Sequence, residues 1–158
     1  MLQLTRKTEY ALIALSHLGR RRLAEEGPAS ARSIAEAYRL PLPLLMNILK
    51  ELAQAGLLTS TRGATGGYVL AAEPAEVSLL QVVHAIEGPV KLTPCCHDED
   101  TLPIVGQSCS VEENCPIQGP IRALHRRILG FVADVTLEEL MTDLPEAEPE
   151  PQPVGAPA

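Results

Sequence analysis

The sequence of 158 residues has no apolar run near the roughly 20 residues that a membrane span needs. Its best candidate, residues 11–18, is interrupted by His17 and runs into three arginines rather than a small-residue cleavage site. A hydrolytic constellation is also missing, because no Ser or Cys stands with both a histidine and a carboxylate that could orient it. No glycine-rich phosphate loop follows a strand. These absences predict a cytoplasmic protein that is not an enzyme.

Cysteine is absent from the whole sequence except residues 95–115, which read CCHDEDTLPIVGQSCSVEENC and contain all four cysteines. Clustered cysteines in a reducing cytoplasm more often bind a metal or carry out redox chemistry than form structural disulfides. The segment is therefore a candidate metal or redox site.

Basic residues are scarce in the second part of the chain, so the net charge of −7 hides an uneven distribution. Residues 1–70 carry nine basic and five acidic side chains, or +4, whereas the remainder carries four and fifteen, or −11. This asymmetry favours a polyanionic partner for the first part, with ordinary solvated charge as the alternative. The apolar content of 46% is sufficient for a compact core.

Two helices are predicted before residue 41. The first begins at Thr5, whose hydroxyl can cap free backbone N–H groups, and ends at Gly19. The second is capped by Ser30 or Ser33 and is interrupted at Leu40, because a proline follows.

A third helix between Pro43 and Gly56 has the clearest apolar period in the sequence, formed by Leu45, Ile48, Leu49 and Leu52. Two short strands, 57–61 and 68–70, follow and flank the turn segment RGATGG. Two short helices followed by a hairpin indicate a winged helix-turn-helix.

Ser78 and Gln81 form a capping box for a fourth helix that closes at Gly88. No period is visible over residues 90–119. Pro120 then fits the first turn of a long helix. Thr136 caps a short last helix, and a disordered tail follows it. The long helix is expected to pack along a second helix, or else within the core of one chain, through Ile121, Leu124, Ile128, Phe131 and Val135.

The exposed side of the third helix presents Asn47, Lys50 and Gln54 as donors and acceptors for base edges, with Met46 alongside offering only apolar contact. Arg62, at the tip of the glycine-rich hairpin, is placed to enter a narrow minor groove. Candidate contacts to DNA phosphates are Arg6, Lys7 and Arg32.

The spacing of Cys109 and Cys115 suits an iron-sulfur cluster held at the end of a loop, with Cys95 or Cys96 as a third ligand. Zinc is the rival, because His97 stands beside Cys96, although close pairs of zinc ligands are missing. The residues alone leave metal binding and free or transiently oxidised thiols both open.

The sequence resembles the IscR/NsrR family of bacterial iron-sulfur winged-helix regulators over about residues 2–143. The resemblance rests on LTRKTEYALIALSHL, SARSIAEAYRLPLPLLMNILKELAQAGLL, STRGATGGYVL, VSLLQVVHAIEGPVKL and TLEEL, and the wing core RGxxGGY is its most specific part. It implies a homodimer that binds palindromic operators and changes its DNA affinity with the state of the cluster. Pro43 and Met46 depart from the family pattern, which leaves the operator sequence open.

The resemblance also implies a ligand set. Cys95 falls where the first family cysteine usually stands, and Cys109 follows only after an insertion. The fourth ligand in the family is either a histidine three residues after the last cysteine, here Gln118, or an acidic residue of the partner's first helix, which corresponds to Glu9. The resemblance thus implies Cys95, Cys109, Cys115 and Glu9, with Cys96 and His97 as alternatives.

The predicted fold is mainly α: a winged helix-turn-helix with a small β-hairpin wing and a long carboxyl-terminal dimerisation helix. The expected parts are a DNA-binding domain (1–88), a cysteine loop (89–119), the dimerisation and terminal helices (120–143) and a tail (144–158). The expected function is a dimeric repressor that senses redox, nitric oxide or iron-sulfur status through a 2Fe-2S or 4Fe-4S cluster. Alternatives are a cluster-free thiol-based regulator, a protein-interaction module or a small electron-transfer protein.

Overall fold

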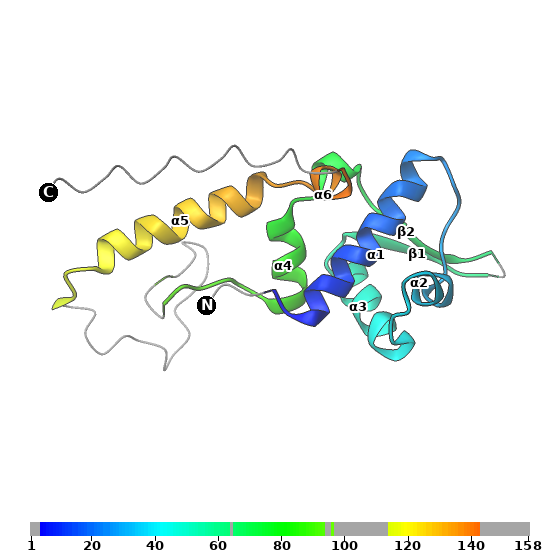
Figure 1. Cartoon of the computed structure of the whole chain (residues 1–158), viewed down its shortest axis with the longest axis horizontal. Helices are drawn as coiled ribbons and strands as arrows, with labels where there is room; N and C mark the ends of the chain where they lie inside the picture. The colour runs from blue at the N-terminus through cyan, green and yellow to red at the C-terminus, as the bar shows by residue number, and fades with distance from the viewer. Residues whose placement is uncertain (1–3, 64, 94–95, 97–113, 143–158) are drawn as a thin grey trace, which may run out of the picture.

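The computed structural model describes residues 4–63, 65–93, 96 and 114–142. A head built from α1 to α4 and a two-stranded hairpin carries a long helix, α5, that projects away from it (Figure 1). This arrangement confirms the predicted fold class, a mainly helical winged helix-turn-helix. The elements are α1 (Arg6–Leu23), α2 (Ala31–Tyr38), α3 (Leu42–Gln54), β1 (Leu58–Thr61), β2 (Gly67–Leu70), η1 (Pro74–Glu76), α4 (Leu79–Glu87), α5 (Gln118–Asp134) and α6 (Leu137–Met141).

Helix α1 begins where the sequence predicts but ends later. The Thr5 hydroxyl accepts a hydrogen bond from the backbone N–H of Thr8, which caps the amino end. The helix continues through Gly19 to Leu23, so the predicted end at Gly19 is wrong. A Cβ atom at Gly19 would lie 2.5 Å from Sδ of Met141 in α6. This glycine therefore serves the packing of α6 on α1 and does not terminate a helix.

The helix-turn-helix consists of α2 and α3. The Ser30 hydroxyl accepts a hydrogen bond of 3.0 Å from Ser33 N, which assigns the cap of α2 to Ser30. Arg39, in the turn, has a left-handed backbone with φ of 54°. Helix α3 starts after Pro41 without a side-chain cap. The predicted apolar face is confirmed, because the buried residues of α3 are Leu45, Ile48, Leu49 and Leu52.

The wing is an antiparallel hairpin whose register runs from Leu58 opposite Leu70 to Thr61 opposite Gly67. Strand β2 is also held on its other side, because Tyr68 N donates to Ala29 O at 2.8 Å and Ala29 N donates to Tyr68 O at 3.1 Å. A Cβ atom on Gly67 would collide with the carbonyl oxygen of Ala29. The second glycine of the GGY segment is therefore required by this close approach.

Both predicted capping boxes are present at the starts of α4 and α6. The Ser78 hydroxyl accepts from Gln81 N while the Gln81 side chain accepts from Ser78 N, and Thr136 and Glu139 repeat the arrangement. The short helix η1 was not predicted. It is confined to three residues that begin at Pro74.

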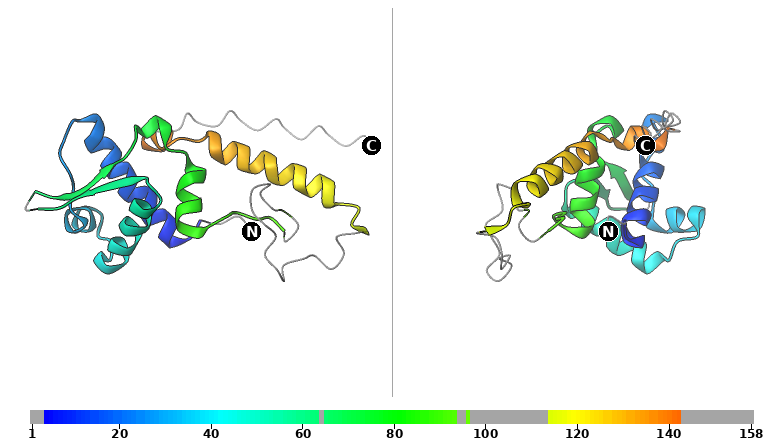
Figure 2. Two further views of the ribbon diagram at one scale, coloured as in Figure 1. Left: turned by 180° about the vertical axis from the view of Figure 1, so that it is seen from behind. Right: turned by 60° about the vertical axis from the view of Figure 1, so that its left-hand side comes forward.

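After α5 the chain returns to the head. Leu79 N donates to Val135 O at 2.8 Å, and Leu137 N donates to Val77 O at 2.7 Å. Helix α6 then packs against α1 and η1. The carboxyl end of α5 is therefore attached to the head, whereas its amino end points away from it (Figure 2).

Helix α5 begins at Gln118, and Pro120 lies in its first turn, as predicted. Of the apolar side chains predicted to form a packing seam, Leu124 is 45% and Phe131 is 71% exposed. These two positions are thus not core residues within one chain. Among the helices that the structure describes, none has both the length and the apolar character of a membrane span.

Candidate nucleic-acid interface and cysteine region

The reading stripe predicted on α3 faces the solvent. Asn47, Lys50 and Gln54 are exposed, and Met46 beside them is 52% exposed. The opposite face of the helix is buried in the core, so the amphipathic pattern fixes which side chains point outward. The stripe offers two amides, one ammonium group and one thioether to a partner.

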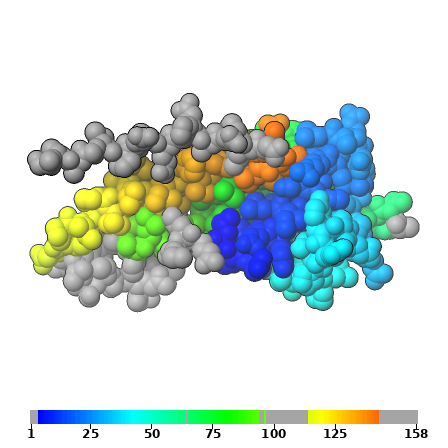
Figure 3. Space-filling view, viewed as in Figure 1, coloured from blue at the N-terminus to red at the C-terminus, as the bar shows by residue number. Residues whose placement is uncertain are grey.

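Arg62 follows the last residue of β1 and is exposed at the end of the wing. Gly63 has a φ of 122°, a conformation that favours glycine and turns the chain at the tip. The base of the tip is closed by Gly67 N, which donates to the Thr61 hydroxyl at 3.3 Å. The space-filling view shows the wing extending beyond the rest of the head (Figure 3).

The three candidate phosphate contacts differ in their surroundings. Arg32 is exposed in the first turn of α2. Lys7 lies with its Nζ 2.7 Å from Oε2 of Glu51 on α3, and both side chains are only about a third exposed. Arg6 is largely exposed and pairs with Glu9 at 3.1 Å. Lys7 thus joins two helices of the head, whereas Arg32 faces solvent.

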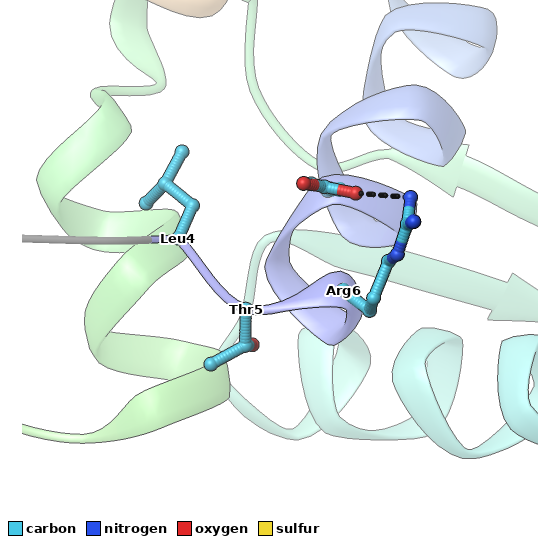
Figure 4. Close-up of a pocket in the computed structure, with 4 residues that line it drawn as sticks. Leu4, Thr5 and Arg6 are labelled. Atoms are coloured by element: carbon cyan, nitrogen blue, oxygen red, sulfur yellow. Dashed lines mark hydrogen bonds and ion pairs between the residues drawn. The ribbon is translucent and has the colours of Figure 1, made fainter.

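Glu9 and Arg6 line a pocket of about 420 Å³ at the start of α1, together with Leu4 and Thr5 (Figure 4). The side chain of Glu9 is 46% exposed, and its ion pair with Arg6 is open to solvent. A solvent-exposed ion pair of this kind contributes at most about 1 kcal/mol. The Glu9 carboxylate can therefore exchange its partner at little cost.

Glu87, at the end of α4, holds the start of α1 in place, a role that no local sequence pattern indicates. Its Oε1 accepts hydrogen bonds from Thr5 N at 3.1 Å, from the Thr5 hydroxyl at 3.0 Å and from the Thr8 hydroxyl. The hydrogen bond from Thr8 is the largest cause that lowers the pKa of Glu87 below its ordinary value, and the bonds from Thr5 act in the same direction. Glu87 immediately precedes the segment that leads to the cysteines.

Two of the four cysteines are described. Cys96 is 1% exposed, and its Sγ lies 3.3 Å from the hydroxyl oxygen of Thr93. Cys115 is half-buried, three residues before α5. The predicted ligands Cys95, Cys109 and His97 lie outside the described residues. Within residues 4–63, 65–93, 96 and 114–142, no three His, Cys, Asp or Glu side chains are grouped to hold a metal ion.

Two histidines on helices take part in packing. His125 is buried at 4% exposure, and neither of its ring nitrogens has a hydrogen-bond partner among the residues that the structure describes. His17 packs edge-on against Tyr38 with ring centroids 5.6 Å apart. Burial, followed by the charge of Arg21, lowers the pKa of His17 below its ordinary value.

Comparison with known proteins gives these features a family context. The HTH-type transcriptional regulator IscR of Aliivibrio salmonicida is 32% identical over 142 residues, which cover 90% of this chain and 79% of that protein. The solved structure of IscR from T. potens shares 28% identity with a TM-score of 0.63, covering 93% of this chain and 91% of the other. The solved structure of CymR, described as the global cysteine regulator of B. subtilis, shares 26% identity with a TM-score of 0.65. The match covers 90% of this chain and 100% of the CymR chain.

The family model of Rrf2, described as an iron-dependent transcriptional regulator, matches residues 4–143 and so spans both the winged head and α5. Membership of such a family implies DNA binding and no enzymatic activity. The match agrees with an outward-facing α3, an arginine at the wing tip and a helix that projects from the head. The chain belongs to the Rrf2 family of transcriptional regulators.

Proposed function

We propose that this protein is a homodimeric transcriptional repressor whose DNA affinity depends on an iron-sulfur cluster bound at the cysteine region. The observation that carries the DNA-binding part is the joint exposure of the α3 stripe and of Arg62 on the wing. Such a head docks α3 in a major groove and the wing against the adjacent minor groove. The excess of basic side chains in residues 1–70 supports the same docking.

The proposal of a homodimer rests on α5. Its 17 residues correspond to about 25 Å of helix, most of it projecting from the head. Ile117, Leu124 and Phe131 recur at seven-residue spacing and are all exposed. A second copy of α5 would cover this apolar row, because seven-residue spacing is the period of two helices packed along each other. Two heads related by a twofold axis suit a palindromic operator.

The donors that are present fit an iron-sulfur cluster in their chemistry. Cys115 is half-buried next to the start of α5, and thiolates are the usual ligands of such clusters. Glu9 offers a partly exposed carboxylate whose only described partner in an ion pair is the flexible Arg6. A cluster held by Cys95, Cys109, Cys115 and a partner subunit's counterpart of Glu9 would supply one-electron redox chemistry and sensitivity to oxidants and nitric oxide.

The surroundings of Cys96 do not favour it as a cluster ligand. Its side chain is almost fully buried, and its sulfur already lies against the Thr93 hydroxyl. Withdrawing it toward a cluster would expose a packed thiol and break that contact. These observations count against Cys96 and leave Cys95 as the proposed third cysteine ligand.

Anaerobic purification followed by visible spectroscopy and assays of iron and acid-labile sulfide tests the cluster. We expect Cys109→Ser and Cys115→Ser to lose most of the iron and the visible absorption, and Glu9→Gln to yield a less stable cluster. Cys96→Ser should retain both signals. Anaerobic wild-type protein without iron, sulfide or visible absorption would rule out the cluster.

Arg62→Ala tests the DNA-binding face separately. The side chain is exposed, so the variant should fold normally and lose roughly tenfold or more in affinity for duplex DNA. Unchanged binding to genomic fragments would contradict the role of the wing.

A cluster-free thiol-based regulator is the second candidate, because the structure is also similar to CymR of Staphylococcus aureus, which has been solved in an oxidized form. In this case the native dimer would have the mass of two polypeptides alone. Its DNA affinity would respond to peroxide through the cysteines, and iron chelation would have no effect.

A further inference from the structure

The amino-terminal half of α3 presents an unusually apolar surface to the solvent. Pro43 and Met46 are exposed there, and Asn47 is the one exposed side chain before Lys50 that can form hydrogen bonds. Met46 is 52% exposed although the neighbouring Leu45 is fully buried. The solvent-exposed surface of the amino-terminal half of α3 therefore consists mostly of carbon and sulfur atoms.

These side chains share one face of the helix. Pro43, Met46, Asn47 and Lys50 follow the i, i+3, i+4, i+7 spacing, which brings them together on one side. In helix-turn-helix proteins the first residues of the second helix contact the base edges in the major groove. Met46 and Asn47 thus occupy the positions where bases are read, if α3 is the reading helix as proposed above.

An isolated exposed apolar residue is common on protein surfaces and needs no explanation by itself. Met46 differs because it lies beside the exposed polar and basic side chains of Asn47, Lys50 and Gln54. The excess of basic residues in this part of the chain favours a polyanionic partner. Glu51, the acidic side chain of α3, is neutralised by Lys7 at 2.7 Å. The negative charge of Glu51 therefore does not repel DNA phosphates that approach Met46.

The major groove carries one apolar group, the 5-methyl group of thymine. A thioether side chain makes no hydrogen bond to a purine edge comparable with that of an amide or guanidinium group. Asn47, adjacent to Met46, can pair with N6 and N7 of an adenine. The chemistry of this pair of side chains matches a thymine next to an adenine in the operator half-site.

We propose that Met46 is a specificity-determining residue that recognises the methyl group of a thymine in each operator half-site. The inference rests on the proposed DNA-binding function and adds to it the chemical group that α3 reads. Met46 contributes by excluding water from the methyl group, and Asn47 adds affinity by its hydrogen bonds to the neighbouring adenine.

The test begins with selection of duplexes from a randomised pool by the full-length protein. Each thymine of the selected site is then replaced in turn by deoxyuridine, which removes only the methyl group. We expect one thymine per half-site at which the replacement weakens binding of the wild-type protein about fourfold, because burial of one methyl group has about this effect.

Protein variants then assign the effect to a side chain. Met46→Ala should bind the thymine and deoxyuridine duplexes equally, whereas Met46→Leu, which keeps the apolar bulk, should retain most of the discrimination. Asn47→Ala is the matched control: it should bind more weakly overall and keep the ratio between the two duplexes. Circular dichroism verifies that the exposed substitutions leave the fold intact.

Two results would overturn the inference while leaving DNA binding intact: tolerance of deoxyuridine at every thymine, or an unchanged ratio in Met46→Ala. A pool from which no duplex is enriched would instead overturn the proposed DNA-binding function, and the inference with it.

Discussion

Lys7 of α1 and Glu51 of α3 form an ion pair with Nζ and Oε2 2.7 Å apart, which joins the first helix to the proposed reading helix. The pair lies at a helix junction inside the head, with both side chains about a third exposed. Lys7 is therefore engaged within the protein, although its position in the sequence also suggests a phosphate contact.

Lys7 and Arg32 are expected to differ in the salt dependence of DNA binding. Arg32→Gln should reduce the slope of log K against log salt by about one, because one phosphate contact is lost. Lys7→Gln should leave the slope nearly unchanged and cost up to about 1 kcal/mol of unfolding free energy. Titrations of a selected duplex at several salt concentrations measure the slopes. Equal decreases for both variants would show that Lys7 also contacts DNA.

Gly67→Ala is expected to destabilise the wing strongly. The added Cβ atom would meet the carbonyl oxygen of Ala29, a backbone atom that can move only if the bridge to Tyr68 opens. We expect a loss of about 2 kcal/mol or more in urea unfolding. Gly27→Ala is the matched control, because a Cβ there meets nothing within 4 Å. Similar losses in both variants would contradict the packing explanation.

Glu87→Gln should change how stability depends on pH. The hydrogen bond from Thr8 lowers the pKa of Glu87, so the carboxylate stabilises the folded state above the ordinary pKa of about 4.3. This contribution is lost as the pH falls through the lower folded-state pKa. We expect the variant to be less stable by about 1 kcal/mol at neutral pH, after allowing for solvent screening.

The difference between the wild type and Glu87→Gln should shrink in urea unfolding at about pH 3. Glu36→Gln, a substitution of an exposed glutamate on α2, serves as the control with little effect at either pH. A difference that stays constant from neutral to acid pH would exclude the carboxylate as its source.

Arg39→Gly is expected to stabilise the protein. Arg39 has a φ of 54°, a left-handed conformation that costs a residue with a side chain about 1 kcal/mol or more. Glycine removes this strain but has a more flexible unfolded state, so the expected net gain is about 0.5 kcal/mol. Arg39→Ala keeps the strain and should show no gain. Thermal unfolding of both variants decides the matter, and a loss for Arg39→Gly would indicate that the arginine side chain itself stabilises the turn.

Local signals explain why much of the fold could be predicted. The caps of α1, α4 and α6 each depend on residues three positions apart, such as Ser78 and Gln81, and all three were identified. The apolar period of α3 likewise determined which side chains face outward, including Asn47 and Lys50. Patterns within a few residues suffice for features of this kind.

Contacts between distant parts of the chain could not be predicted in the same way. The role of Gly19 depends on Met141 at the far end of the chain, and a glycine inside a helical pattern therefore looked like a helix end. Glu87 meets Thr5 across a sequence separation of 82 residues. The ligand roles of Cys95 and Cys109 remain predictions, because both lie outside the described residues.

The attachment of α5 to the head at one end has a mechanical consequence. The backbone hydrogen bonds of Val135 and Leu137 and the packing of α6 join the helix to the head, so the two are expected to tilt together. For a rod of about 25 Å, a tilt of roughly 10° at one end displaces the other by about 4 Å. In the proposed homodimer, a small tilt far from the wing would thereby change the spacing of the two heads by about the height of a base-pair step.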